Sequence, residues 1–287
     1  MSPAVRLALV RVVVGGFSLA YLAKRRKMLR RVAGTDPRLF SPVGVVKVLE
    51  RPLPVPVVEA TVYATLAANV AFLLGWRHRC SGPAFAGLLL WQLSYRNSWS
   101  MIYHTDNLLV LHALILGLSP SADAVSVDAL RGRAPAQSGV GYGWPIELMN
   151  AVTTLSYFVA GIAKVAGPLG GQWISGESLR GQVAVDGLRK ELMGDGAAPV
   201  AYALYDKVWL WRAMAAGTMV VELGAPVFLA DRRLARLWAA AAFTMHWAVL
   251  AIMKIKFRYQ LSGAAFASFA ALQRGPAGSR AVGCRRR

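Results

Sequence analysis

Apolar segments that recur along the whole chain restrict its fold more than any other feature. A helix needs about 20 predominantly apolar residues to cross the hydrocarbon layer of a bilayer. Hydrophobic residues make up 56% of the 287 positions and charged residues 16%, whereas soluble domains average roughly 45–50% and about 25%. The sequence therefore predicts an all-α integral membrane protein, a polytopic bundle of about seven to eight transmembrane helices.

The apolar segments differ in length, and the fourth and the last are the shortest. The segments are Val5–Ala23, Pro56–Trp76, Pro83–Tyr95, Asn107–Leu118, Trp144–Val165, Val208–Ala230, Leu234–Met253 and Leu261–Leu272. We expect the fourth and the last to be tilted, extended by inward-facing polar residues or partly buried in protein. Residues 1–273 are predicted to form one transmembrane domain, and residues 274–287 a basic disordered tail.

The positive charge of the chain lies between the apolar segments. The formal net charge is +19. Because the basic residues lie between apolar segments, they indicate a role in membrane topology or in contacts with anionic lipid, and not the binding of nucleic acid. The basic run Lys24–Arg31 follows the first apolar segment directly, a stop-transfer pattern that favours a retained helix over a cleaved signal peptide. Glu177–Met193 mixes charges with Leu and Val at helical spacing, which predicts an amphipathic helix at the membrane surface.

Lys164 is the residue most open to a chemical role. It lies at the end of the apolar run Trp144–Val165 and precedes a Gly-rich turn. A lysine at this depth either extends to the membrane surface or takes part in chemistry. Gly161, about one turn earlier, would let another helix approach closely. Partial burial would then favour the neutral amine, which is the form of lysine that accepts a proton.

Glu59 and Glu222 also lie inside apolar segments. Glu59 and Glu222 are expected to have basic partners, because an isolated carboxylate in hydrocarbon is costly. The available partners are Arg96, Lys164 and Arg212. The sequence alone does not decide which pairs form.

A stretch of polar and aromatic residues, Arg96–Asn107, joins two apolar runs without Gly or Pro. Polar backbone is tolerated at membrane depth where it is buried in protein or lines a cavity. Two interpretations remain open, an exposed turn between helices and a cavity wall with His104 as its acid–base group. His246, inside an apolar segment, either hydrogen-bonds a neighbouring helix or lines such a site.

Several function classes have no support in the sequence. It contains no zinc-protease, serine-hydrolase, phosphate-loop or dinucleotide-binding motif. No cluster of histidines and carboxylates indicates a metal. The paired broken helices of many transporters are not visible either.

One pattern resembles a known family. Residues 157–164 read Tyr-Phe-x-Ala-Gly-x-x-Lys, and residues 173–176 read Trp-x-x-Gly. This pattern resembles the core of vitamin K-dependent gamma-glutamyl carboxylase and of its bacterial relatives, the HTTM (horizontally transferred transmembrane) proteins. Weaker matches occur in the same order on both sides of it, so that the resemblance covers about Val5 to Leu272. They are Ser98, Trp99, His104, Glu222, Leu223, Asp231, Arg232, His246 and Phe257.

The resemblance implies a reaction and the residues that carry it. Lys164 would be the base that deprotonates a lipophilic quinol of the vitamin K or menaquinol type. Oxygen would convert the quinol to its epoxide through a basic alkoxide, which removes a proton from a substrate glutamate, and carbon dioxide would trap the carbanion. His104 would assist at the carboxylation step, and no metal is implied. The further residues expected to bind the quinol are His246, Trp99, Trp173, Arg96 and Glu222.

The chain also departs from the carboxylase pattern. The animal enzyme has a large lumenal region after its membrane part, whereas this sequence stops soon after its last apolar segment. Tyr103 stands where the family has Asn, and the spacer between Lys164 and Trp173 is longer and contains three glycines. The quinol-dependent half of the reaction is therefore implied more firmly than carboxylation of protein glutamates.

Three functions remain open at this point. The first is a quinol-dependent carboxylase or epoxidase, of the carbon–carbon lyase type, in a bacterial cell membrane. Its partners would be the lipid bilayer, the quinol and a protein or peptide substrate, with oxygen and carbon dioxide as co-substrates. The second is a non-catalytic membrane subunit that binds quinone or lipid, and the third is a transporter of small solutes.

Overall fold

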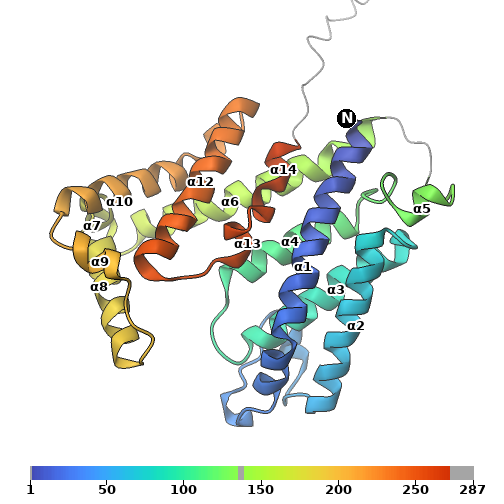
Figure 1. The fold of residues 1–287 in the computed structure, drawn as a ribbon, viewed down its shortest axis with the longest axis horizontal. Helices are drawn as coiled ribbons and strands as arrows, with labels where there is room; N and C mark the ends of the chain where they lie inside the picture. Colours follow the sequence, from blue (N-terminus) through green and yellow to red (C-terminus); the bar gives the residue numbers. More distant parts are fainter. Residues whose placement is uncertain (1, 135–138, 272–287) are drawn as a thin grey trace, which may run out of the picture.

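The computed structural model describes residues 2–134 and 139–271, and these ranges contain helices and no strand (Figure 1). The all-α prediction is therefore confirmed for the described residues. The predicted tail at residues 274–287 lies outside them. The helices are α1 (Pro3–Ala33), α2 (Val55–Leu74), α3 (His78–Asn97), α4 (His104–Gly117), α5 (Val127–Leu130), α6 (Trp144–Ala166), α7 (Gly170–Ser175), α8 (Glu177–Leu192), α9 (Pro199–Leu204), α10 (Val208–Leu223), α11 (Ala225–Phe228), α12 (Arg232–Met253), α13 (Arg258–Leu261) and α14 (Ala267–Ala270). Single 3₁₀ turns lie at Pro37–Leu39, Gly44–Val48, Gly139–Tyr142 and Ala264–Phe266.

The arrangement has two sides, joined by the long helix α6 (Figure 1). On one side α1 packs against α2, α2 against α3 and α3 against α4. On the other side α10 and α12 pack with the short helices α7, α8 and α9. Helix α6 contacts α4 on the first side and α10 on the second, and α13 and α14 lie between the two sides.

Among the described residues, four helices are long and apolar enough to cross a membrane, namely α1, α2, α6 and α12. The chain therefore has the helices of an integral membrane protein, while the count of seven to eight spans stays a prediction. The sixth predicted segment is not continuous, because α10 ends at Leu223 and α11 begins at Ala225. Pro226 lacks the N–H that would continue the helical ladder to the carbonyl of Glu222.

Helix α1 runs ten residues past the predicted end at Ala23, to Ala33. Its N-terminus is capped by Ser2, whose hydroxyl accepts from the Val5 N–H at 3.4 Å. The basic run forms the last turns of the helix, where positive side chains interact favourably with the helix dipole. The stop-transfer sequence is thus a continuation of the first helix and not a loop.

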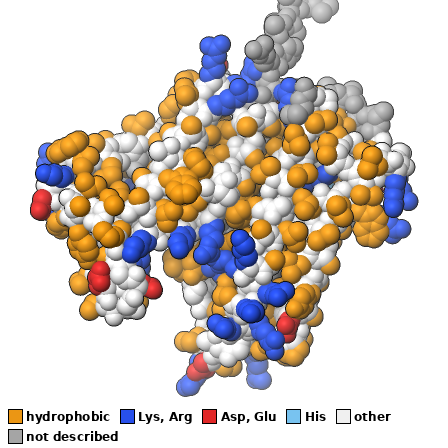
Figure 2. Space-filling view, in the orientation of Figure 1, with side chains coloured by type: hydrophobic (Ala, Val, Ile, Leu, Met, Phe, Trp, Pro, Cys, Tyr) orange, Lys and Arg blue, Asp and Glu red, His pale blue; other side chains and the backbone are white. Residues whose placement is uncertain are grey.

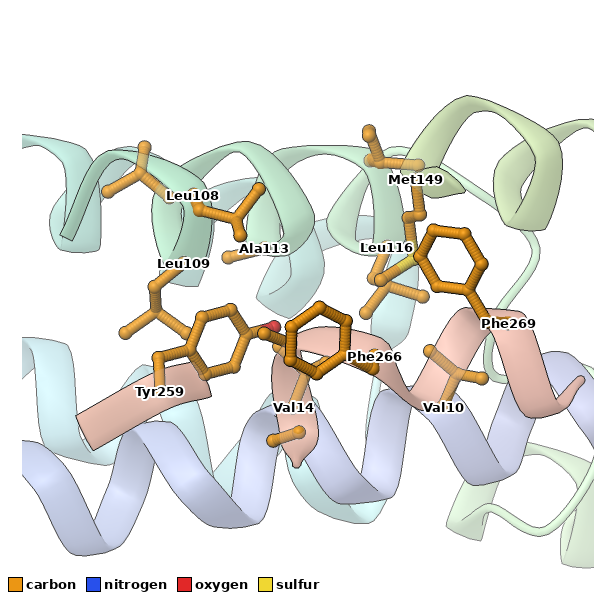
Figure 3. Packing of buried hydrophobic residues seen from close by; sticks show 14 of the residues in the cluster. Val10, Val14, Leu108, Leu109, Ala113, Leu116, Met149, Tyr259, Phe266 and Phe269 are labelled. Carbon is orange, nitrogen blue, oxygen red and sulfur yellow. The ribbon is translucent and has the colours of Figure 1, made fainter. Parts of the chain in front are cut away.

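The two short apolar segments are buried inside the protein, which is one of the expected outcomes. Helix α4 has 14 residues and packs between α1, α3 and α6. The last segment forms α13, a 3₁₀ turn and α14 in place of one helix. Figure 3 shows the contact between them. Side chains of α4 lie on one side of Tyr259, Phe266 and Phe269, and Val10 and Val14 of α1 lie on the other side. In a bilayer such contacts stabilise through close packing.

Helix α8 covers most of the segment predicted to be amphipathic. Its apolar side chains Val185, Leu188 and Leu192 are 69%, 61% and 79% exposed, while its charged residues form the pairs Asp186–Arg189 and Asp186–Lys190. A helix that leaves an apolar face uncovered in this way suits the surface of a membrane. The helix is confirmed, and its place at the membrane surface stays a prediction.

Candidate functional site

Lys164 and Glu222 form an ion pair between α6 and α10. The Lys164 Nζ atom lies 2.6 Å from each carboxylate oxygen of Glu222. The Lys164 side chain is 21% exposed and that of Glu222 7%. Of the partners expected for Glu222, the structure selects Lys164, so this lysine does not simply extend to the membrane surface.

Gly161 allows this pair to form. A Cβ atom at this position would lie 2.9 Å from Leu223 Cδ2 and 3.0 Å from the Glu222 Cβ. The absence of a side chain thus lets α10 approach α6 about one turn before Lys164. The close approach predicted from the sequence is confirmed.

Replacing Gly161 with Ala is expected to lower the free energy of unfolding by about 1–3 kcal/mol, because α10 must move away from α6 to admit the methyl group. Gly87→Ala is the matched control, since a Cβ at this helical glycine would meet no atom within 4 Å. Thermal unfolding of the two variants in one detergent gives the comparison. Equal unfolding temperatures would contradict the close packing of α6 on α10.

Trp173 covers the ion pair from α7. The Lys164 Nζ atom lies 5.4 Å from the centroid of the Trp173 ring, within the range of a cation–π contact. Gly176 ends α7 with φ +81°, and a Cβ there would lie 2.7 Å from the backbone of Trp211 and Arg212 in α10. The Trp-x-x-Gly pattern therefore places an aromatic ring on Lys164 and lets the end of α7 pack directly on α10.

Tyr157 and His246 extend the site along α6. Tyr157 precedes Lys164 by about two turns on the same face of the helix. Its hydroxyl lies 3.4 Å from Nδ1 of His246 in α12, and this nitrogen lies 2.8 Å from the carbonyl oxygen of Ala242. Since a carbonyl only accepts, Nδ1 carries the hydrogen and Nε2 of the neutral ring is left as an acceptor. The Phe257 ring packs perpendicular to the imidazole at 5.1 Å between centroids.

Arg96 belongs to a second polar cluster, between α1, α3 and α4. It forms an ion pair with Asp106, which is 1% exposed. The Tyr21 hydroxyl donates to Asp106 at 2.7 Å, and the Arg96 guanidinium lies 3.9 Å from the centroid of the Tyr103 ring. The polar stretch after α3 therefore contributes to buried contacts and is not simply an exposed turn.

Trp99 and His104 flank this second cluster in the sequence. Trp99 packs against the rings of Phe40 and Tyr95, with centroids 5.1 and 6.1 Å away. Its indole nitrogen is buried and has no hydrogen-bond partner among the described residues. The side chain of His104 lies outside what the structure describes, which places only its backbone, as the first residue of α4.

Glu59 takes a partner that the sequence analysis did not consider. It lies 3.5 Å from Arg30 at the basic end of α1, and not beside Arg96, Lys164 or Arg212. The reason is that the basic run continues α1 as a helix and so reaches the start of α2. The set of expected partners was right for Glu222 and wrong for Glu59.

The segment that follows α12 touches both clusters. Phe257 packs on His246, and three residues later Gln260 accepts from the Thr105 hydroxyl at 3.3 Å, beside Asp106. The structure thus brings together Lys164, Glu222 and Trp173. It places His246 beside Tyr157, about two turns earlier on α6, and joins His246 to the cluster of Arg96 through Phe257 and α13. Sequence reasoning assigned no role to Tyr157, although its spacing from Lys164 could have indicated one. In the described ranges no group of three His, Cys, Asp or Glu side chains could hold a metal ion.

Comparison with known proteins identifies the family of the chain. No curated protein and no solved structure matches the chain. A family model described as the HTTM domain matches residues 2–267. This match covers nearly the whole chain, including the pair Lys164–Glu222, the ring of Trp173 and His246. The chain is therefore a membrane protein that belongs to the HTTM domain family.

Proposed function

We propose that this HTTM protein is a carboxylase-like membrane enzyme that uses a lipophilic quinol, with Lys164 as the base that takes the quinol proton. The ion pair of Lys164 with Glu222 is the observation that carries the proposal. The two side chains are only 21% and 7% exposed, and a paired lysine and carboxylate at this depth mark a functional position in a membrane protein.

Glu222 has a defined part in this proposal. At a separation of 2.6 Å the Glu222 carboxylate is placed to accept a proton from the Lys164 Nζ. Lys164 then presents an amine that accepts the proton of a quinol hydroxyl. The resulting ammonium stabilises the negative charge left on the quinol oxygen.

The surrounding side chains suit a flat aromatic ligand. Trp173 lies on one side of Lys164. Tyr157 of α6, His246 of α12 and Phe257, which follows α12, form an aromatic group about two turns away along α6. Such rings bind a quinol by stacking and keep water from the reacting atoms. A bound quinol would supply the reducing power with which oxygen is activated.

The rest of the reaction follows from the resemblance to the carboxylase. A carbon acid, such as a glutamate of a protein or peptide, would lose a proton and add carbon dioxide, with His104 assisting. Arg96 and Trp99 would help to bind the quinol from the side of the second cluster, which α13 and Phe257 connect to His246. The bacterial cell membrane is the proposed location, because the quinol is soluble in lipid.

Mass spectrometry of the quinone products tests this proposal. Purified protein in nanodiscs would receive menaquinol or vitamin K hydroquinone with oxygen and bicarbonate. We expect quinone epoxide from the unchanged protein and from Lys256→Ala, a control at an exposed lysine outside the site, and none from Lys164→Ala. If the folded protein makes no epoxide from either quinol, a non-catalytic subunit that binds quinone or lipid becomes the better assignment.

A further inference from the structure

A cleft of about 250 Å³ lies between the basic end of α1 and the start of α2, away from the site of Lys164. It is lined by Arg26, Lys27, Arg30, Glu59, Val62 and Tyr63. Its three basic side chains face one acidic side chain. The cleft therefore carries an excess of positive charge, with Val62 and Tyr63 as its uncharged lining.

The length of the apolar part of α1 would place the cleft at the depth of the lipid headgroups. The apolar stretch Val5–Ala23 of α1 is roughly 28 Å long at 1.5 Å per residue, close to the ~30 Å of hydrocarbon in a bilayer. Arg26 and Arg30 follow this stretch within about two turns. Figure 2 shows Lys and Arg side chains gathered over this end of α1, next to hydrophobic side chains.

The basic side chains are placed to hold a phosphate. Arg26 and Arg30 are four residues apart, and so lie on one face of α1, with Lys27 beside them. Glu59 lies 3.5 Å from Arg30, and this single carboxylate compensates only one of the three charges. The planar donors of arginine suit the oxygens of a phosphate group, and a lysine adds a further charge.

The opposite wall of the cleft is suited to the rest of a lipid. Tyr63 is 52% exposed, and an aromatic residue with a polar tip is typical of the boundary between headgroups and hydrocarbon. Val62 is buried beneath it, while Val70 and Leu74 further along α2 are 41% and 51% exposed and continue an apolar surface. A soluble phosphate would use the basic wall and leave this apolar surface without a role.

We propose that this cleft binds the phosphodiester headgroup of an anionic phospholipid, whose acyl chains lie along α2. The Arg26 and Arg30 side chains donate to the phosphate oxygens, and Lys27 adds charge. Glu59 weakens the site, because its carboxylate competes with the phosphate for Arg30 and repels it.

Native mass spectrometry of the full chain, released from detergent with added lipid, tests this site. We expect the unchanged protein to retain phosphatidylglycerol in preference to phosphatidylcholine. Arg26→Gln/Arg30→Gln should weaken that retention on the order of tenfold, since each basic residue near the surface contributes attraction. Lys24→Gln/Arg31→Gln removes the same charge from exposed positions of the same helix that do not line the cleft, and should keep the preference.

Further variants separate the possible outcomes. Glu59→Gln should tighten the retention of phosphatidylglycerol, and Lys27→Gln should weaken it, so these single changes decide the question if the double variant does not fold. Equal loss in the cleft variant and in its control would overturn the proposal, as would the absence of any preference in the unchanged protein. Displacement of phosphatidylglycerol by millimolar inorganic phosphate would show a site for soluble phosphate and overturn the lipid assignment.

Discussion

Replacing Lys164 with Met is expected to lower the free energy of unfolding by about 3–5 kcal/mol, because it leaves a buried carboxylate without its positive partner. Glu222 is the more enclosed member of the pair, at 7% exposure. Its two oxygens both accept from the lysine. The loss should be visible as a lower midpoint in thermal or detergent unfolding.

Replacing the other member of the pair should lower the free energy of unfolding by less. After Glu222→Gln, Lys164 keeps a long flexible chain that is already 21% exposed, and so its charge can reach water or headgroups. The double variant Lys164→Met/Glu222→Leu should recover most of the stability, because apolar side chains of similar size commonly replace a buried ion pair at little cost. Lys256→Met, at an exposed position, is the control. Normal stability of Lys164→Met alone would show that the pair is open to water.

The periodicity of α6 made much of this site predictable. The predicted run Trp144–Val165 differs from the observed helix by one residue at its end. Tyr157, Gly161 and Lys164 are spaced four and three residues apart and therefore share one face. Gly161 indicated a close neighbouring helix. That helix is α10, and its close approach brings Glu222 to Lys164.

Other parts of the site depend on contacts that no local pattern contains. The pair Arg96–Asp106 lies within one polar stretch, which reads equally well as an exposed turn. The link between the two clusters runs through Phe257 and Gln260, which lie just before the last predicted apolar segment. That segment is enclosed by α1, α4 and α12, and protein contacts permit short broken helices that lipid would not.

The number of membrane spans stays a prediction for a related reason. Hydropathy reports that a segment avoids water, and it does not report whether lipid or protein surrounds it. Helix α4 is apolar and only 14 residues long, with Leu109, Ala113 and Leu116 fully buried. Length separates such core helices from spans more reliably than composition does.

Replacing Lys164 with Arg is expected to reduce quinone epoxide formation on the order of 100-fold or more, the usual contribution of a general base. Arginine keeps the positive charge and can pair with Glu222, so this variant should fold with nearly normal stability. It cannot present a neutral amine, because the guanidinium stays protonated at any pH at which the protein is folded. The variant therefore distinguishes a role of Lys164 in proton transfer from a role in which only its positive charge is needed.

Two further variants make this result decisive when they are assayed by the same mass spectrometry. Lys256→Arg, at an exposed position, should form epoxide at the unchanged rate. Glu222→Gln tests the other member of the pair, because an amide cannot take the proton that Lys164 must give up. If Lys164→Arg is inactive, Lys164 is the base, and the loss caused by Glu222→Gln measures how far this base depends on the carboxylate. If Lys164→Arg stays active and Glu222→Gln is inactive, the carboxylate accepts the proton and the lysine only stabilises the charge that remains.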